Sequence, residues 1–384
     1  MRRERTPIPA SMGSAQFLSS ARLSTLIRVV AGGVAFAAAC AGAQAGTRKP
    51  PPSLVFGIYP GGGAGTVGPA GRTAADDPAK QLEALKQLRA PGRTFVLHIY
   101  ASYSGPGSAP VADQVGRDVA LYTAEGFQVE LVLTYRPAAG KPTTDVPAFA
   151  AFARDAVHTL GSNPRFISLQ VTNEANVGNA PNAADGFYAG AEQALIQGLI
   201  AAKTEARARG FTHVKVGFNW AYSRDPRETA FWRGLRLRGG SAFLRSLDWV
   251  GLDVYPCTWG PRVPAASLDV AARKTTLTSL AALRRRFMPL AGLPAGIPLH
   301  ISENGYPTGP GRTQSAQVRV MKATIAAVNG TRSRYHVTDY RWFDLRDADS
   351  SSSSFEAQYG LLRDDYTPKA GFAAYRVLVA KLGV

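Results

Sequence analysis

Residues 128–135 read QVELVLTY and residues 166–173 read FISLQVTN, and a stretch of helical period from Val146 to Leu160 lies between them. The two runs are nearly continuous in apolar and β-branched residues, which indicates strands that are buried on both faces. An amphipathic helix between two such strands is typical of a parallel pair whose outer side is covered by the helix. These 46 residues therefore predict one strand–helix–strand unit.

The same pattern repeats from residue 54 to residue 384. The expected strands are Leu54–Tyr59, Thr94–Ser102, Gln128–Tyr135, Phe166–Asn173, His213–Trp220, Trp249–Tyr255, Pro298–Glu303 and Val337–Phe343. The expected helices are Pro78–Leu88, Val111–Glu125, Val146–Leu160, Phe187–Arg209, Thr229–Leu247 with a break at Gly239-Gly240, Leu268–Phe287, Gln314–Val328 and Lys369–Leu382. Eight such units predict an α/β protein, a single (β/α)8 TIM barrel. A doubly wound open sheet is the alternative, but the glycine run 61–65 lacks the G-x-G-x-x-G register of that fold.

Residues 1–45 have a different composition. Basic residues precede an apolar run from Val29 to Ala41, and small residues at 43–45 follow it, which is the order of an export signal cleaved after Ala45. Lipid attachment at Cys40 is an alternative, and translation could start at Met12. We expect residues 46–53 to form a Pro-rich spacer and residues 54–384 to form one folded domain of a secreted, extracellular protein.

The chain carries 44 Lys+Arg against 27 Asp+Glu, a net charge of +17. The basic residues are scattered along helical stretches and are not interleaved with aromatics, which favours a solvated face over a nucleic-acid footprint. The apolar run near the N-terminus is too short for a stable membrane span. We therefore expect no nucleic-acid partner, and we expect the protein to be a monomer. If cleavage follows Ala45, Cys257 is the one cysteine of the mature chain, so no internal disulfide can form.

Two strands end in a carboxylate. The fourth strand is followed by Glu174 and the seventh ends in Glu303. Because the carboxyl ends of barrel strands form the active-site face, and strands four and seven lie on opposite sides, these side chains should face one another across the mouth. Asn173 and Glu174 are neighbours, so both can point into the mouth only if the strand ends or bulges there.

Segments 171–177 and 299–306 resemble the acid/base and nucleophile motifs of clan A of the glycoside hydrolases, retaining TIM-barrel enzymes with glutamates on strands four and seven. The resemblance covers most of residues 54–384. It implies Glu174 as acid/base, Glu303 as nucleophile, Asn173 as the ligand of a sugar 2-hydroxyl and Tyr255 as hydrogen-bond partner of the nucleophile. It also implies Trp342 as the platform under the sugar.

The chain departs from the clan in two places. Several families of the clan carry an Arg at the end of strand two and a His at the end of strand three, where this chain has Tyr100 and Arg136. The family within the clan is therefore not assigned. Further aromatic residues are expected at the mouth, where rings offer sugars an apolar surface. The expected substrate-binding set thus also contains Trp220, Tyr100, Tyr135, Arg136, Trp259 and Tyr306.

The resemblance implies a retaining hydrolase that cleaves the β-glycosidic bonds of an oligo- or polysaccharide, and we expect no cofactor. A transglycosylase using the same two glutamates and a catalytically inactive glycan-binding barrel, with the glutamates misaligned, are the alternatives. The five histidines show no metal-ligand spacing, so no metal site is expected. His300 has the opposite parity to Glu303 and is expected to face the helices.

Overall fold

The computed structural model describes residues 54–62, 73–181, 183–223 and 225–384. The predicted export signal at 1–45, the alternative lipid site at Cys40 and the spacer at 46–53 lie outside these residues. In the described part of the chain, no helix is both long and apolar enough to cross a membrane.

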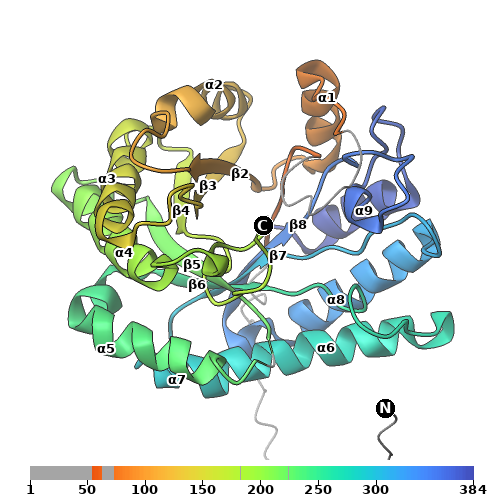
Figure 1. Ribbon diagram of the computed structural model, residues 1–384. Helices are drawn as coiled ribbons and strands as arrows, with labels where there is room; N and C mark the ends of the chain where they lie inside the picture. Colours follow the sequence, from red (N-terminus) through yellow and green to blue (C-terminus); the bar gives the residue numbers. More distant parts are fainter. Residues whose placement is uncertain (1–53, 63–72, 182, 224) are drawn as a thin grey trace, which may run out of the picture. The chain divides into compact units, whose positions relative to one another are not determined.

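Eight parallel strands close into a barrel in chain order, with β8 paired to β1 (Figure 1). The strands are β1 Val55–Ile58, β2 Phe95–Tyr103, β3 Gln128–Tyr135, β4 Phe166–Val171, β5 Lys215–Ala221, β6 Trp249–Asp253, β7 Leu299–Glu303 and β8 Val337–Trp342. The predicted single (β/α)8 barrel is confirmed, and the open-sheet alternative is wrong because closure leaves no edge strand.

The helices lie outside the strands in Figure 1. They are α1 Pro78–Leu88, α2 Val111–Ala124, α3 Pro142–Leu160, α4 Ala191–Ala208, α5 Glu228–Ser246, α6 Leu268–Ala282, α7 Met288–Leu290, α8 Gln314–Tyr335 and α9 Ala370–Leu382. A π-helical turn at Leu283–Phe287 joins α6 to α7, and short 3-10 turns lie at 185–187, 265–267 and 355–357. The expected break in α5 falls at Gly240, where φ is 53° and ψ is −154°.

Alternation along each strand divides the side chains between two environments. One set points outward and packs on the helices, as Phe218 of β5 does against Trp232 and Phe243 of α5. The other set points into the barrel. The helices thus bury the outward apolar side chains, and the inward positions are free to carry polar groups.

The barrel interior holds a buried charge network. Arg341 Nε lies 3.2 Å from Glu130 Oε1, and Arg341 Nη2 lies 2.8 Å from Asp339 Oδ1. His98 Nδ1 lies 2.9 Å from the same Glu130 oxygen. Burial alone would raise the pKa of Glu130, but the charge of Arg341, together with hydrogen bonds from the histidines, holds it well below its usual value. Charges inside the barrel are therefore compensated by partners on other strands.

The prediction that His300 faces the helices is wrong. Its Nε2 lies 3.2 Å from Asp339 Oδ2, and its ring stacks on Trp249 at 4.3 Å, inside the barrel. The reason is an irregular register between β6 and β7. Leu252 pairs with Ile301, but Asp253 pairs with Glu303, so Ser302 is an extra residue and the parity changes there.

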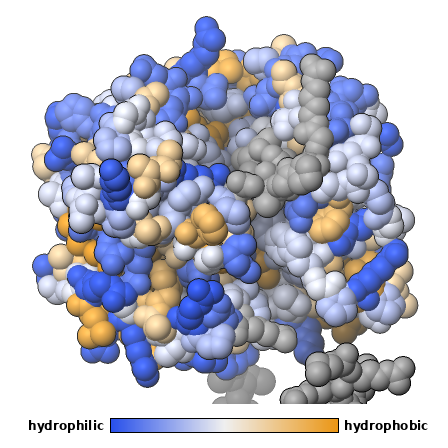
Figure 2. Space-filling view, viewed as in Figure 1, coloured by the Kyte–Doolittle hydropathy of each residue, from blue (hydrophilic) through white to orange (hydrophobic). Residues whose placement is uncertain are grey.

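On the face shown in Figure 2, hydrophobic residues form small, separate patches among hydrophilic ones. Several basic side chains on helices pair with acids on neighbouring elements, as Arg238 does with Glu192 and Arg319 with Asp269. These contacts are consistent with the solvated basic surface expected from the sequence.

Replacing Arg341 by Met should lower the free energy of unfolding by about 3–5 kcal/mol, because Glu130 and Asp339 then lose their common buried cation. Urea unfolding monitored by fluorescence measures the change. Arg319→Ala is the control, since Arg319 and Asp269 are 37% and 53% exposed and such a pair contributes at most about 1 kcal/mol. Equal effects of the two substitutions would contradict the network's role.

Candidate active site

Glu174 and Glu303 meet at the carboxyl ends of the strands. One carboxylate oxygen of each lies within 4.8 Å of the other, and one oxygen of Asp253 lies within the same distance of both. Glu303 and Asp253 are buried, and Glu174 is partly exposed. Three acids, one after β4 and one each at the ends of β6 and β7, therefore share one small volume at the barrel mouth.

The turn after β4 aims Glu174 into the mouth. The strand ends at Val171, and the next residues include two in the left-handed region, Thr172 with φ 65° and Glu174 with φ 48°. Such angles are uncommon for residues other than glycine and persist where surrounding contacts impose them. The Glu174 N–H donates to Asn219 Oδ1 at 2.8 Å, which fixes this turn. The strand therefore ends before Asn173 and Glu174. This is one of the two conditions under which both neighbouring side chains can point into the mouth.

Two phenols hold the Glu303 carboxylate. Tyr100 of β2 donates to Oε1 at 2.6 Å, and Tyr255, after β6, donates to Oε2 at 2.7 Å. Burial and the Glu303 charge raise the pKa of both tyrosines well above the usual value, so they remain donors. Each oxygen of Glu303 therefore receives a hydrogen bond from a phenol, and the two bonds fix the orientation of the carboxylate.

Glu174 has the opposite electrostatic environment. Burial, followed by the charges of Glu303 and Asp185, raises its pKa to about 8, and Arg136 partly opposes the shift. Arg136 Nε lies 3.5 Å from Asp185 Oδ1, and its Nη2 donates to the Ala183 carbonyl at 3.0 Å. Glu174 thus favours its protonated form at neutral pH.

Asn173 and Asp185 fasten the loop after β4. The Asn173 N–H donates to Asp185 Oδ2 at 2.7 Å, and the Asn173 side-chain amide donates to the Ala183 carbonyl at 2.9 Å. Burial raises the pKa of Asp185 to about 7, against the lowering effects of Arg136 and two backbone N–H groups. Asn173 lies beside Glu174, as expected, but its amide is already engaged within the loop. A sugar ligand role for Asn173 stays a prediction.

Three predicted mouth residues lie elsewhere. Trp342 and Trp220 are fully buried on the outward face of their strands, where Trp342 packs on Tyr375 of α9 and Trp220 on Trp232 of α5. Tyr135 is also fully buried and packs on Phe149 of α3. The predictions that these three bind substrate are wrong, because strand alternation directs them to the helices.

Other aromatic side chains line the mouth instead. Phe343, one position after Trp342, stacks on Tyr59 at 5.4 Å and lies 6.4 Å from Tyr255. The peptide bond that follows Phe343 is cis. Trp259 is 58% exposed, its ring lies 5.2 Å from that of Tyr255, and its Nε1 donates to Glu356 Oε1 at 2.7 Å. Trp259 therefore lies at the rim where the sequence predicted it.

Tyr306 lines a cavity of about 160 Å³ together with Cys257, Arg312 and Phe355. Its ring is buried and lies 5.3 Å from the Arg312 guanidinium carbon. Cys257 is a free, partly buried thiol. Among the described residues, neither side chain contacts the two glutamates through a hydrogen bond.

Sequence reasoning missed Asp253 and Asn219. Asp253 belongs to the segment GLDVYP, two positions before Tyr255, so its inward direction was readable from the parity of that strand. Glu174, Asp253 and Glu303 also form the one group of three potential metal ligands found in the described part of the chain. Hydroxyl groups of tyrosine and serine and an asparagine amide already contact the oxygens of Glu303 and Asp253, a pattern that suits proton sharing.

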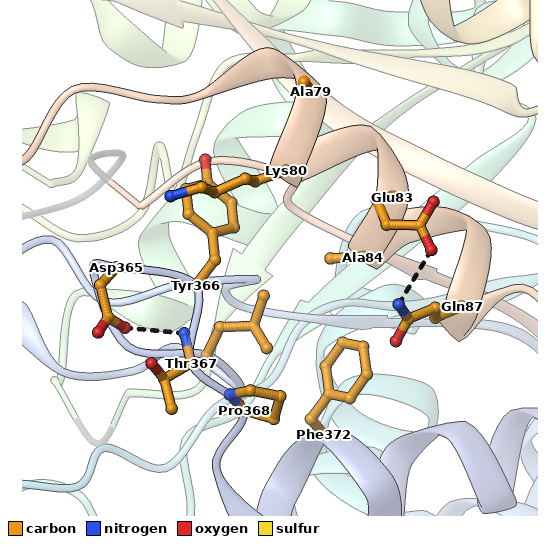
Figure 3. A pocket seen from close by; sticks show the side chains of 11 residues that line it. Ala79, Lys80, Glu83, Ala84, Gln87, Asp365, Tyr366, Thr367, Pro368 and Phe372 are labelled. Atoms are coloured by element: carbon orange, nitrogen blue, oxygen red, sulfur yellow. Dashed lines mark hydrogen bonds between the residues drawn. The ribbon is translucent and has the colours of Figure 1, made fainter.

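A separate groove of about 580 Å³ lies between α1 and residues 362–372 (Figure 3). Its acidic side chains, Glu83 and Asp365, are exposed and bond to the nearby Gln87 and Thr367. None of its lining residues belongs to the mouth cluster, so the groove is not the candidate active site.

No protein family model and no curated protein match the chain. Solved structures of glycoside hydrolases do match its fold. A β-glucosidase from Exiguobacterium marinum is 13% identical with a TM-score of 0.56, covering 86% of this chain and 97% of its own. A family 39 glycoside hydrolase from Bacteroides cellulosilyticus WH2 is 16% identical with a TM-score of 0.54, covering 86% and 64%.

A β-glucuronidase from an uncultured Clostridium sp. is 10% identical with a TM-score of 0.53, covering 85% of this chain. The match covers 50% of that protein, so the chain spans about half of its length. At these identities the likeness establishes the fold that the chain shares with these glycosidases.

Glu174→Gln should stabilise the protein at alkaline pH. The unfolded chain ionises Glu174 near its usual 4.5, whereas the folded chain keeps the proton up to about 8, so this group lowers stability as pH rises between those values. Partial exposure limits the gain to roughly 2–4 kcal/mol. Urea unfolding of both proteins at pH 4 and pH 8.5 measures it. We expect the two proteins to differ in stability at pH 8.5 but not at pH 4. If they are equally stable at pH 8.5 as well, the pKa of Glu174 is not raised.

Proposed function

We propose that the protein is a glycoside hydrolase that cleaves β-glycosidic bonds with retention of anomeric configuration. The supporting observation is the approach of Glu174 and Glu303 to within 4.8 Å. Carboxyl groups about 5–5.5 Å apart are typical of retaining enzymes, whereas inverting enzymes need roughly 6.5–9.5 Å to admit a water between them. The inactive glycan-binding alternative requires misaligned glutamates and lacks this support.

The proposed reaction is a double displacement. Glu303 attacks the anomeric carbon while Glu174 gives its proton to the leaving glycosidic oxygen, so a glycosyl ester forms as the glycosidic bond breaks. Water then attacks the same carbon, Glu174 takes its proton, and Glu303 leaves as a carboxylate. If a sugar hydroxyl replaces that water, the same residues perform transglycosylation.

The charges at the mouth agree with the two roles of Glu174, as an acid in the first step and as a base in the second. The negative charge of Glu303 is one cause of the raised pKa of Glu174. Esterification of Glu303 removes that charge, which lowers the pKa of Glu174 and makes it a base for the second step. Tyr100 and Tyr255 each donate to one oxygen of Glu303 and so orient the carboxylate for attack.

The proposed substrate is an oligo- or polysaccharide, and no cofactor takes part. The exposed ring of Trp259 and the partly exposed Tyr59 at the mouth offer the apolar surface that a sugar ring requires. The names of two of the similar structures, a β-glucosidase and a β-glucuronidase, are in accord with a β-linked substrate. Export through the signal at 1–45 and action outside the cell as a monomer complete the proposal.

Glu303→Ala should reduce turnover of aryl β-glycosides at least about a thousandfold, because the nucleophile is lost. Glu174→Ala should reduce it roughly 10²- to 10⁴-fold with poor leaving groups. Azide should restore turnover of Glu174→Ala on an activated aryl glycoside. Kinetics with a panel of aryl glycosides measures these effects, and proton NMR of the first-formed sugar should show the β anomer.

Glu205→Ala is the matched control, since Glu205 lies on α4 and pairs with Arg209 away from the mouth. We expect its turnover to equal that of the unmodified protein. An α anomer as first product would overturn retention, and full activity in either mouth variant would overturn the assigned roles.

The kcat/KM of the proposed enzyme should fall as pH rises through about 8, because Glu174 must carry a proton in the free protein. Below that pH the acid is present, and above it the proton is lost. Initial rates from pH 5 to pH 10 measure the alkaline limb. In Glu174→Ala assayed with an activated leaving group this limb should vanish, and its persistence would assign it to another residue.

A further inference from the structure

Asp253 is a third carboxyl group in the mouth for which the double displacement has no use. Asp253 is the last residue of β6 and is 2% exposed. One of its carboxylate oxygens lies within 4.8 Å of oxygens of both Glu174 and Glu303. The titratable groups that face it are these two glutamates and the phenols of Tyr100 and Tyr255.

The contacts of Asp253 reach both catalytic segments. On one side, its Oδ1 lies 2.6 Å from the Oγ of Ser302, the residue before Glu303. On the other side, its Oδ2 accepts a hydrogen bond from the Asn219 side-chain amide, and Asn219 Oδ1 accepts the backbone N–H of Glu174. Asp253 therefore links β7 to the left-handed turn that carries Glu174.

The packing around this link is tight. A Cβ atom on Gly251, two positions before Asp253, would lie 2.3 Å from Ser302 Oγ and 3.0 Å from the Asn219 Cβ. Only a residue without a side chain leaves room for both partners at this level of the barrel. The register shift at Leu252/Asp253 brings Ser302 inward at the same place.

The charge state of Asp253 follows from its surroundings. A retaining reaction needs Glu303 ionised, and a second buried negative charge within 4.8 Å would be unfavourable for it. Burial, with the charges of Glu303 and Glu174, raises the pKa of Asp253 well above its usual value. The proton has a ready acceptor, because a serine hydroxyl can accept as well as donate.

We propose that Asp253 acts as an uncharged carboxylic acid, a positioning residue whose carbonyl accepts from Asn219 and whose O–H donates to Ser302. In this way it holds the Glu174 turn and the Glu303 strand at their working separation. The inference rests on the proposed function. An asparagine at this position would offer the same two groups, a carbonyl to Asn219 and an N–H to Ser302.

The test compares Asp253→Asn with Asp253→Ala. The alanine variant leaves the Asn219 amide and Ser302 without their common partner, and we expect kcat to fall roughly 10- to 100-fold, because small misplacements of reacting groups have effects of this size. Asp253→Asn should recover most of that loss, and its alkaline limb should stay near pH 8. If Asp253 were ionised, the amide would remove a charge beside Glu174, and the limb would move to lower pH.

Infrared difference spectroscopy gives a readout that does not need activity. The spectrum of the unmodified protein minus that of Asp253→Asn at pH 7 should contain the carbonyl stretch of one protonated carboxyl group. Loss of carboxylate bands in its place overturns the proposal, as does an Asp253→Asn variant that is no more active than Asp253→Ala. If the infrared result holds but the unmodified protein hydrolyses no glycoside, the proposed function fails and the protonated Asp253 stands.

Discussion

The crowding of three carboxyl groups in a buried mouth is the constraint on which the site depends. Two phenols donate to the oxygens of Glu303, and Glu174 and Asp253 lie within 4.8 Å of it. Burial and the charge of Glu303 raise the pKa values of both Glu174 and Asp253, which favours their protonated forms. Below the mouth, inside the barrel, the buried Glu130 differs from these acids, because the charge of Arg341 holds its pKa below the usual value.

Sequence periodicity was sufficient for the barrel and for the two glutamates. Strand β3 has the bounds that its pattern predicts, and so does α1. The reason is physical: strands buried on both faces are almost continuously apolar, and their carboxyl ends must meet at one face. Glu174 and Glu303 could thus be located from their place in the order of strands, without knowledge of any side-chain contact.

The direction of individual side chains was harder to predict. Trp342, Trp220 and Tyr135 stand at strand ends, yet alternation turns them to the helices, and Phe343 occupies the inward position next to Trp342. His300 shows the converse, because one extra residue in β7 reverses the parity that sequence alone assigns. Asp253 and Asn219 escaped notice since each is unremarkable along the chain, and their significance arises from partners on other strands.

The tether on Trp259 bears on how a ligand would bind at the rim. Its indole N–H donates to Glu356, on the loop after β8, while Trp259 itself follows β6, so one hydrogen bond joins two loops and restrains a ring that belongs to an exposed residue. A ring that is already immobile loses little rotational entropy when a molecule stacks on it. Such preorganisation strengthens binding mainly by slowing the release of the bound molecule from this rim.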